Sequence, residues 1–315
     1  MSNYGFFSDM YLPIKESLSE VKIRLANLYA TDVETASEIL SYLSESEGKL
    51  IRPVLVLLSS DNKQQEAIDI ASAIELIHIA SLLHDDVIDG ADLRRGREAI
   101  NARWGEKWAV LVGDFLLSTA FNIILKEKDR RIFEIFTKAS LVMTEGEMAE
   151  LEVKNSLVVD EAQYLAIIYG KTASLFEASG RVGAIIGGKS EEPFADYGKN
   201  LGFAFQITDD VLDISSENPT KPIGQDIKNG KLTLPLIHSL REANPGEKKK
   251  ILELIEANNF SEVKRIVEKY GGIEYSRNLA EEYIEGAKSC LKLLGSSKCK
   301  DSLLNLADSV RMRVN

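Results

Sequence analysis

The side chains best placed to do chemistry are aspartates, which occur in two clusters of the same pattern, DDxxD. The clusters are Asp85, Asp86 and Asp89 in SLLHDDVID, and Asp209, Asp210 and Asp213 in FQITDDVLDI. On a helix, residues four apart lie about 6 Å from each other on one face, and the residue after the first is turned away by about 100°. Carboxylates so placed repel one another, and a divalent cation removes the repulsion. Since Mg²⁺ prefers carboxylate and phosphate oxygens, the clusters predict a Mg²⁺ site for a diphosphate.

A solvated acidic patch on a polar helix is the alternative explanation of such clusters. Each cluster here follows an apolar stretch, Ile77–Leu83 in one case and Leu201–Ile207 in the other. Partly burying several carboxylates costs free energy unless something compensates their charge. The apolar surroundings therefore favour metal binding over a surface patch.

Basic residues near the aspartates are candidates for direct contact with phosphate. They are Arg94 and Arg95 in ADLRRGR, Lys221 and Lys231 after the second cluster, and Lys49 and Arg52 in EGKLIRP. Arginine binds phosphate through two parallel hydrogen bonds, whereas lysine acts as a mobile point charge. Each residue taken singly is a surface charge, so its placement beside the aspartates is what makes it a candidate.

The elements that must carry these residues are helices. No proline occurs between Val54 and Glu192, apolar residues recur every three or four positions, and sustained strand alternation is absent. The stretch Ile70–Leu83 is apolar nearly all round, which is typical of a central helix in a bundle. Asp160 with Gln163 predicts a helix start, and Ser215–Gly230 predicts a loop. The fold class predicted is an all-α bundle.

Composition limits the remaining classes. The chain has 315 residues with 44% hydrophobic composition and no composition break, which favours one domain over residues 1–315. A net charge of −11 argues against nucleic-acid binding, although metal ions let an acidic protein bind a polyanion. No run is expected to reach the roughly 20 apolar residues of a membrane span, and we expect a cytoplasmic protein.

Taken in order, these motifs resemble those of trans-type polyprenyl diphosphate synthases. The resemblance covers roughly Gly48 to Pro235 and includes both aspartate clusters, the LRRGR run, the Lys171–Thr172 pair and the segment from Gly230 to Pro235. It implies a helical bundle of the isoprenoid synthase type with a central active-site cavity, and a homodimer. It also implies that the chain condenses isopentenyl diphosphate with an allylic diphosphate.

The resemblance further implies residue roles. Asp85, Asp89 and Asp209 would be the direct Mg²⁺ ligands; Arg94, Lys171, Lys221 and Lys231 would contact the allylic diphosphate; Lys49, Arg52, His78 and Arg95 would hold isopentenyl diphosphate; Thr172 and Gln206 would line the reacting carbons. Metal and cationic groups stabilise the charge on the departing diphosphate. The allylic cation is then attacked by the double bond of isopentenyl diphosphate, and the released diphosphate takes the proton. No side-chain base is needed.

The chain departs from the family pattern at five positions. Glu47 and Leu50 replace a glycine and a basic residue in GGKRxRP, Glu98 and Ala99 replace Pro-Thr after RRGR, and Thr220 replaces a glycine. The principal charged positions are kept. Because Glu47 would repel a nearby diphosphate, a subunit of a heteromeric synthase that needs a partner stays open as an alternative.

Product length should depend on bulk one helical turn before the first cluster. Ala80 and Ser81 occupy that turn and are small, so a growing chain would pass them. Phe136 is the candidate floor of the channel, and core packing explains it equally well. We predict a hexaprenyl to octaprenyl product, with geranylgeranyl diphosphate as the alternative.

Other readings fit less well. Gly183–Ser190 matches the phosphate-loop pattern GxxxxGK[ST], but that loop follows a strand, and the preceding residues have a helical pattern that predicts a glycine-capped helix end. His84 beside Asp85 would need further histidines to form a phosphohydrolase site, and the chain has three in all. A terpene cyclase would not need a second DDxxD cluster.

Overall fold

The computed structural model describes residues 11–45, 48–154, 159–215 and 224–312. It is 81% helical, which confirms the predicted all-α class. The chain divides into two compact units. The first comprises the described residues within Met1–Ser140, Ala178–Ala195 and Ser296–Ser302, and the second those within Leu141–Glu177, Asp196–Gly295 and Leu303–Asn315. The single domain expected over residues 1–315 stays a prediction.

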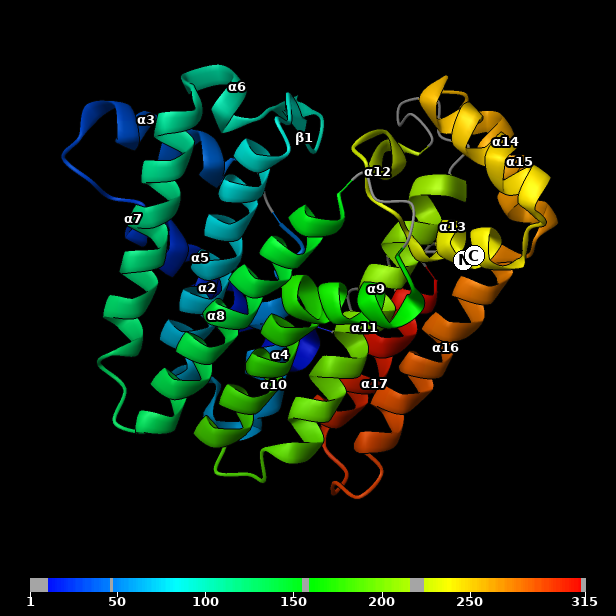
Figure 1. Ribbon diagram of the computed structural model, residues 1–315. Coiled ribbons are helices and arrows are strands. Elements are labelled where there is room, and N and C mark those ends of the chain that lie inside the picture. Colours follow the sequence, from blue (N-terminus) through cyan, green and yellow to red (C-terminus); the bar gives the residue numbers. More distant parts are fainter. Residues whose placement is uncertain (1–10, 46–47, 155–158, 216–223, 313–315) are drawn as a thin grey trace. The chain divides into compact units, whose positions relative to one another are not determined.

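The first unit is built around the long helix α5. Its elements are η1 (Leu12–Ile14), α2 (Lys15–Leu28), α3 (Glu34–Ser44), α4 (Ile51–Ser60), η2 (Asp61–Lys63), α5 (Gln64–Ile88), β1 (Leu93–Arg94), β2 (Arg97–Glu98), α6 (Ile100–Trp104) and α7 (Glu106–Ile124). Every residue from Ile70 to Ile77 is buried, because α2, α4 and α7 pack around α5 (Figure 1). The apolar stretch therefore forms the central helix that its sequence predicts.

Four helices have residues in both units. They are α8 (Arg130–Val153), α10 (Ser174–Ile186), α11 (Glu192–Ser215) and α17 (Lys298–Arg311). In the first unit α10 lies against α4 backbone to backbone, since a Cβ on Gly183 would sit 2.4 Å from the Val56 carbonyl oxygen. After Ile186, Gly188 takes a φ of +67° and the Lys189 N–H donates to the Ala184 carbonyl at 2.9 Å. The segment that resembles a phosphate loop is thus a glycine-capped helix end, as predicted.

The LRRGR run forms a tight hairpin that its sequence pattern does not predict. Leu93 pairs with Glu98 and Arg94 with Arg97 in an antiparallel ladder. Between them Arg95 and Gly96 have φ values of 53° and 78°. Positive φ at both central residues is the geometry of a type I′ turn, which suits the twist of a two-residue hairpin. The turn fixes the direction in which Arg95 leaves the backbone.

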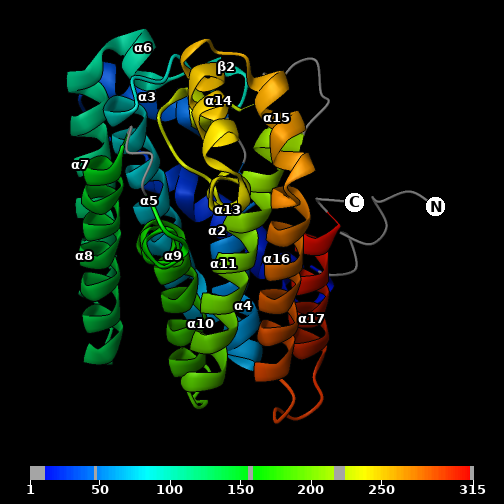
Figure 2. The same ribbon diagram turned by 45° about the vertical axis from the view of Figure 1, so that its right-hand side comes forward.

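The second unit contains the aspartate-bearing part of α11 and the C-terminal helices. Its own elements are α9 (Glu161–Ile168), η3 (Tyr169–Ala173), α12 (Gln225–Lys228), α13 (Leu234–Glu242), α14 (Pro245–Glu256), α15 (Phe260–Lys269) and α16 (Gly272–Cys290). Helices α14 and α15 lie side by side, and α15 and α13 contact α16 (Figure 2). A buried apolar cluster that includes Val211, Ile227, Leu236 and Val263 joins these helices to α11.

Local signals in the second unit are partly as predicted. Asp160 accepts from the Gln163 N–H at 2.8 Å and the Gln163 side chain accepts from the Asp160 N–H at 3.0 Å, which confirms the helix start. Of the loop predicted at Ser215–Gly230, residues 216–223 lie outside the described part, and Gln225–Lys228 form a short helix instead.

Two described helical stretches, Ile51–Ile88 and Glu106–Ile124, are long and apolar enough to cross a membrane by length and composition. The expectation that no run would be long and apolar enough is therefore wrong by this criterion. Of the most apolar window in the first stretch, 61% is buried inside the protein, as in the core helix of a soluble protein. The prediction that the chain does not span a membrane is not tested by these helices.

Candidate active site

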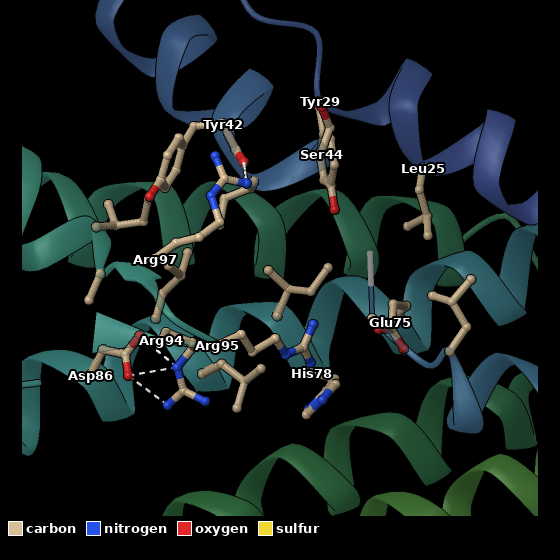
Figure 3. A pocket seen from close by; sticks show the side chains of 18 of the residues that line it. Leu25, Tyr29, Tyr42, Ser44, Glu75, His78, Asp86, Arg94, Arg95 and Arg97 are labelled. Carbon is tan, nitrogen blue, oxygen red and sulfur yellow. Dashed lines mark hydrogen bonds and ion pairs between the residues drawn. The ribbon is translucent and has the colours of Figure 1, made fainter. Parts of the chain in front are cut away.

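The first unit contains a cavity of about 230 Å³ that gathers several predicted residues. Its walls come from α2, α3, α5 and the hairpin (Figure 3). His78, Asp86, Arg94 and Arg95 line it together with Gly48, Glu75, Tyr29, Tyr42, Ser44 and Arg97. Lys49 is exposed and Arg52 is half-buried near the start of α4; neither is among the lining residues. His78, Arg94 and Arg95 thus line one cavity, and the substrate-binding roles predicted for them stay predictions.

Several arginines make the cavity cationic, and the buried carboxyl groups of Glu75 and Asp86 partly balance their charge. Burial lowers the pKa of Arg52 to about 10, an effect that Glu75 opposes, so Arg52 stays charged at neutral pH. Burial raises the pKa of Glu75 to about 7, and Arg52 and Arg95 hold it from rising further. Burial lowers the pKa of His78 well below its usual value, and the charges of Arg52, Arg95 and Arg94 lower it further. The His78 ring is therefore neutral. Such a site suits an anion.

Glu75 and Arg95 converge on the backbone at Gly48. A Cβ added to Gly48 would lie 3.3 Å from Nη1 of Arg95 and 3.4 Å from Oε1 of Glu75. A glycine therefore lets both charged groups approach the chain at this point. This residue directly precedes Lys49 of the predicted phosphate-binding set.

The first aspartate cluster divides into two kinds of carboxylate. Asp86 is buried and forms an ion pair with the Arg94 guanidinium (Figure 3). Nε of Arg94 donates to Oδ1 and Oδ2 of Asp86 at 2.7 and 2.8 Å, and Nη2 lies 2.6 Å from Oδ1. Asp85 and Asp89 are half-buried at the end of α5. Asn101 fastens this end by donating to the carbonyls of Asp86 and Ala91 at 3.2 and 2.9 Å.

His84 has a packing role in this structure. Its Nε2 lies 3.3 Å from the Val110 carbonyl oxygen and 3.5 Å from Asp114 on α7. The ring fits against Gly113, where a Cβ would be 2.3 Å from Nε2. The histidine beside the cluster therefore joins α5 to α7.

In the second unit a chain of hydrogen bonds connects three predicted residues to a tyrosine. Thr172 Oγ1 donates to Gln206 Oε1 at 2.8 Å, and Gln206 Nε2 donates to Asp210 Oδ1 at 2.9 Å. The Tyr164 hydroxyl donates to Asp210 Oδ2 at 2.6 Å. Burial and then the charge of Asp226 raise the pKa of Asp210. In both clusters the second aspartate is thus buried and held by other side chains.

The other two aspartates of the second cluster differ from Asp210 in their surroundings. Asp209 is half-buried on α11. Asp213 accepts from the backbone N–H groups of Gln225 and Asp226, each at 3.2 Å, and so caps the short helix α12.

Lys171 lies in a π-helical turn, Tyr169–Ala173, between α9 and α10. Its Nζ lies 2.5 Å from Oε2 of Glu150 and 2.7 Å from Glu147, and Lys231 Nζ lies 3.2 Å from the same Glu150 oxygen. Burial disfavours the Lys171 charge, but Glu150 and Glu147 outweigh it and the pKa is raised. Lys221 lies outside the described residues.

Whether these residues fit Mg²⁺ can be judged from their donors. Among the described residues no group of three or more His, Cys, Asp or Glu side chains could hold a metal ion. Asp85, Asp89 and Asp209 nevertheless offer half-buried carboxylates, the donors that Mg²⁺ prefers. In proteins Mg²⁺ is usually held by one or two carboxylates, with substrate phosphates and water completing its shell. Within each unit the half-buried carboxylates therefore suit a metal ion whose other ligands come from a diphosphate and water.

The three predicted chain-length residues all lie in the first unit. Ala80 and Phe136 are buried, and Ser81 donates its hydroxyl to the His78 carbonyl at 2.9 Å. The roles predicted for them in product length are not tested by this burial.

Sequence reasoning missed four functional candidates. Glu75 could have been found from the sequence, because it is a charged residue inside an apolar stretch and lies one helical turn before His78. The sequence gives no such indication for Tyr164, Glu147 or Glu150, because only their tertiary partners distinguish them from other helical residues.

Comparisons with known proteins agree on one family. The family profile described as "Polyprenyl synthetase" matches residues 33–271. An octaprenyl diphosphate synthase of Haemophilus influenzae is 37% identical over 289 residues, with 88% of each chain covered. A short chain isoprenyl diphosphate synthase of Methanothermobacter thermautotrophicus is 35% identical, with 95% of this chain and 94% of that one covered. A crystal structure of polyprenyl synthase from Caulobacter crescentus, complexed with calcium and isoprenyl diphosphate, superposes with a TM-score of 0.90 at 32% identity, covering 97% and 98%.

The fold and these structural neighbours define an all-α isoprenyl synthase. Within that class the chain belongs to the polyprenyl synthetase family. It is a trans-polyprenyl diphosphate synthase, a chain-elongating transferase of prenyl groups.

Proposed function

We propose that the chain lengthens an allylic diphosphate by Mg²⁺-dependent 1′-4 condensation with isopentenyl diphosphate. The observation that carries the proposal is the cationic cavity of the first unit, where Arg94, Arg95 and a neutral His78 meet. The Caulobacter protein, similar over 97% of this chain, binds a divalent cation and isoprenyl diphosphate, which supports the choice of ligands.

Isopentenyl diphosphate would bind through Arg95, which lines the cavity, and through Lys49 and Arg52 near the start of α4. Arginine matches phosphate with two parallel hydrogen bonds. Because His78 is neutral, it would contribute a hydrogen bond and no charge. Glu75 attracts both Arg52 and Arg95, so its charge would offset the repulsion between the two guanidinium groups.

The allylic diphosphate would bind to Lys171, Lys231, Lys221 and Arg94. When bound, Mg²⁺ neutralises the charge that builds on the departing diphosphate. Asp85 and Asp89 of the first cluster and Asp209 of the second would be the Mg²⁺ ligands, and Asp86 and Asp210 would position Arg94 and Gln206. The oxygens of Thr172 and Gln206 would stabilise the allylic cation after its C–O bond breaks. The new C–C bond forms to isopentenyl diphosphate, whose lost proton goes to the released diphosphate.

For the product we propose hexaprenyl to octaprenyl diphosphate. The small residues Ala80 and Ser81, one turn before Asp85, support it, as does the similarity to an octaprenyl synthase. The similarity to a short chain isoprenyl diphosphate synthase supports a shorter product, and geranylgeranyl diphosphate stays the alternative.

We further propose that the protein acts as a cytoplasmic homodimer that neither spans a membrane nor binds nucleic acid. The acidic net charge of −11 supports the last point. A heteromeric subunit remains the alternative because of Glu47, which lies outside the described residues.

Steady-state kinetics of Arg95→Ala test the assignment of the cavity. We expect the KM for isopentenyl diphosphate to rise about a hundred-fold, as loss of a charge-assisted phosphate contact would cost about 3 kcal/mol, while the KM for the allylic substrate changes little. Arg130→Ala, whose side chain is 89% exposed, is the control. A rise in the allylic KM alone would show that the cavity takes the other substrate.

A further inference from the structure

Two lysines of the second unit share one carboxylate oxygen. Oε2 of Glu150 lies 2.5 Å from Nζ of Lys171 and 3.2 Å from Nζ of Lys231. Glu147 adds a second carboxylate 2.7 Å from Lys171. All four side chains are between 14% and 19% exposed, so two cations and two anions form a compact, neutral and mostly buried cluster.

The cluster depends on a close approach between two helical segments. Glu147 and Glu150 are three residues apart on α8 and so share a face. The neighbouring glycines bring this face to the π-helical turn, because a Cβ on Gly146 would lie 2.8 Å from the Cα of Gly170 and one on Gly170 2.7 Å from the Cα of Gly146. Lys171 follows Gly170 directly and is thereby placed against both glutamates.

The geometry of the lysines matches one diphosphate. Since both ammonium groups touch the same oxygen, their nitrogens can be no more than about 6 Å apart, a span that neighbouring phosphate groups can bridge. An ammonium group is a compact charge on a flexible stem with three donors, so it can move from a carboxylate to a phosphate oxygen. A carboxylate that remained close would repel the phosphate.

We propose that Glu150 is a positioning residue that stands in for the substrate diphosphate. It holds Lys171 and Lys231 together when no diphosphate is bound, and its charge weakens diphosphate binding and so speeds release of the product diphosphate. This inference rests on the proposed function, in which the two lysines bind a diphosphate. Glu147 has the same effect on Lys171 to a smaller extent.

Titration calorimetry with inorganic diphosphate and Mg²⁺ tests the proposal on the full chain. Glu150→Gln keeps the shape of the side chain and removes its charge, and we expect diphosphate to bind about ten-fold more tightly, because a unit charge about 6 Å away in a partly solvated site contributes an energy of that order. Diphosphate should also inhibit the variant more strongly, with kcat falling more than the KM for the allylic substrate. Glu152→Gln, an exposed position on the same helix, removes the same charge and should leave the affinity unchanged.

The outcomes separate this proposal from the function on which it rests. If Glu150→Gln binds diphosphate as the unaltered chain does, or more weakly, Glu150 is not a stand-in, although elongation by the unaltered chain would leave the proposed function intact. Failure of the unaltered chain to bind diphosphate would overturn both. If Glu150→Gln does not fold, Glu147→Gln decides: tighter binding supports the proposal, and equal or weaker binding overturns it.

Discussion

Asp85 and Asp86 are adjacent in one cluster, yet their surroundings differ so much that the same substitution should act differently on each. Asp86 is 4% exposed and receives three short contacts of 2.6 to 2.8 Å from Arg94, which is 38% exposed. Breaking a fully buried ion pair costs about 3–5 kcal/mol and an exposed one at most about 1, so we expect about 2 kcal/mol for Asp86→Asn. With an unfolding entropy of about 2.1 cal/mol/K per residue over 315 residues, Tm should fall by about 3 °C.

Asp85→Asn should behave in the opposite way. Asp85 is half-buried, so its contacts contribute at most about 1 kcal/mol, and the substitution relieves its repulsion with Asp89. We expect Tm to stay within about 1 °C, while kcat/KM falls at least about a hundred-fold because a metal ligand is lost. Asp86→Asn should lower kcat/KM about ten- to a hundred-fold through the displaced Arg94.

Thermal unfolding by circular dichroism and steady-state elongation kinetics measure both effects. If Asp86→Asn and the unaltered chain have the same Tm, the ion pair between Asp86 and Arg94 does not stabilise the fold, contrary to the prediction. If Asp85→Asn retains activity, Asp85 does not hold the metal.

Three further predictions concern other parts of the site. Tyr164→Phe removes the 2.6 Å hydrogen bond to the buried Asp210 and should cost about 2 kcal/mol, measured as a lower urea midpoint; an unchanged midpoint would contradict the role of Tyr164. In the folded state Glu75 has a pKa of about 7, against an ordinary value of 4.5. Its contribution to the free energy of unfolding is therefore complete below pH 4.5 and is lost as the pH rises through 7. At about 1.36 kcal/mol per pH unit, the loss is at most roughly 3 kcal/mol. Glu75→Gln should abolish this part of the decline in Tm between pH 5 and 8, and an identical decline in both proteins would refute the assignment. Ala80→Phe places a ring in the turn before Asp85 and should shorten the product, as chromatography of the chain lengths will show; an unchanged product would mean that the growing chain does not pass Ala80.

The parts of the fold that depend on local pattern could be read from the sequence. The apolar stretch Ile70–Leu83 predicted the central helix, because a helix apolar on all sides must be covered on all sides. The Asp160 cap and the glycine-capped end at Gly188 likewise depend on a few neighbouring residues.

Features that depend on distant contacts or on unusual backbone geometry could not be read. Arg95 has a positive φ at the first central position of the turn, where glycine, asparagine or aspartate is the usual residue. Because an arginine stands there, the sequence did not predict the hairpin. The π-helical turn at Lys171 has no sequence signature, and its glutamate partners depend on the approach of Gly146 to Gly170. The sequence showed the aspartate clusters. It did not show that protein side chains hold Asp86 and Asp210, because these contacts come from distant parts of the chain.

The central claim is that this chain elongates prenyl diphosphates with a metal held by its aspartates. The most direct test incubates the purified chain with Mg²⁺, farnesyl diphosphate and labelled isopentenyl diphosphate, beside an Asp85→Ala variant, and resolves the products by length. We predict products longer than geranylgeranyl diphosphate that disappear in the variant. A folded chain that forms no product, or a variant that forms the same products, would contradict the claim.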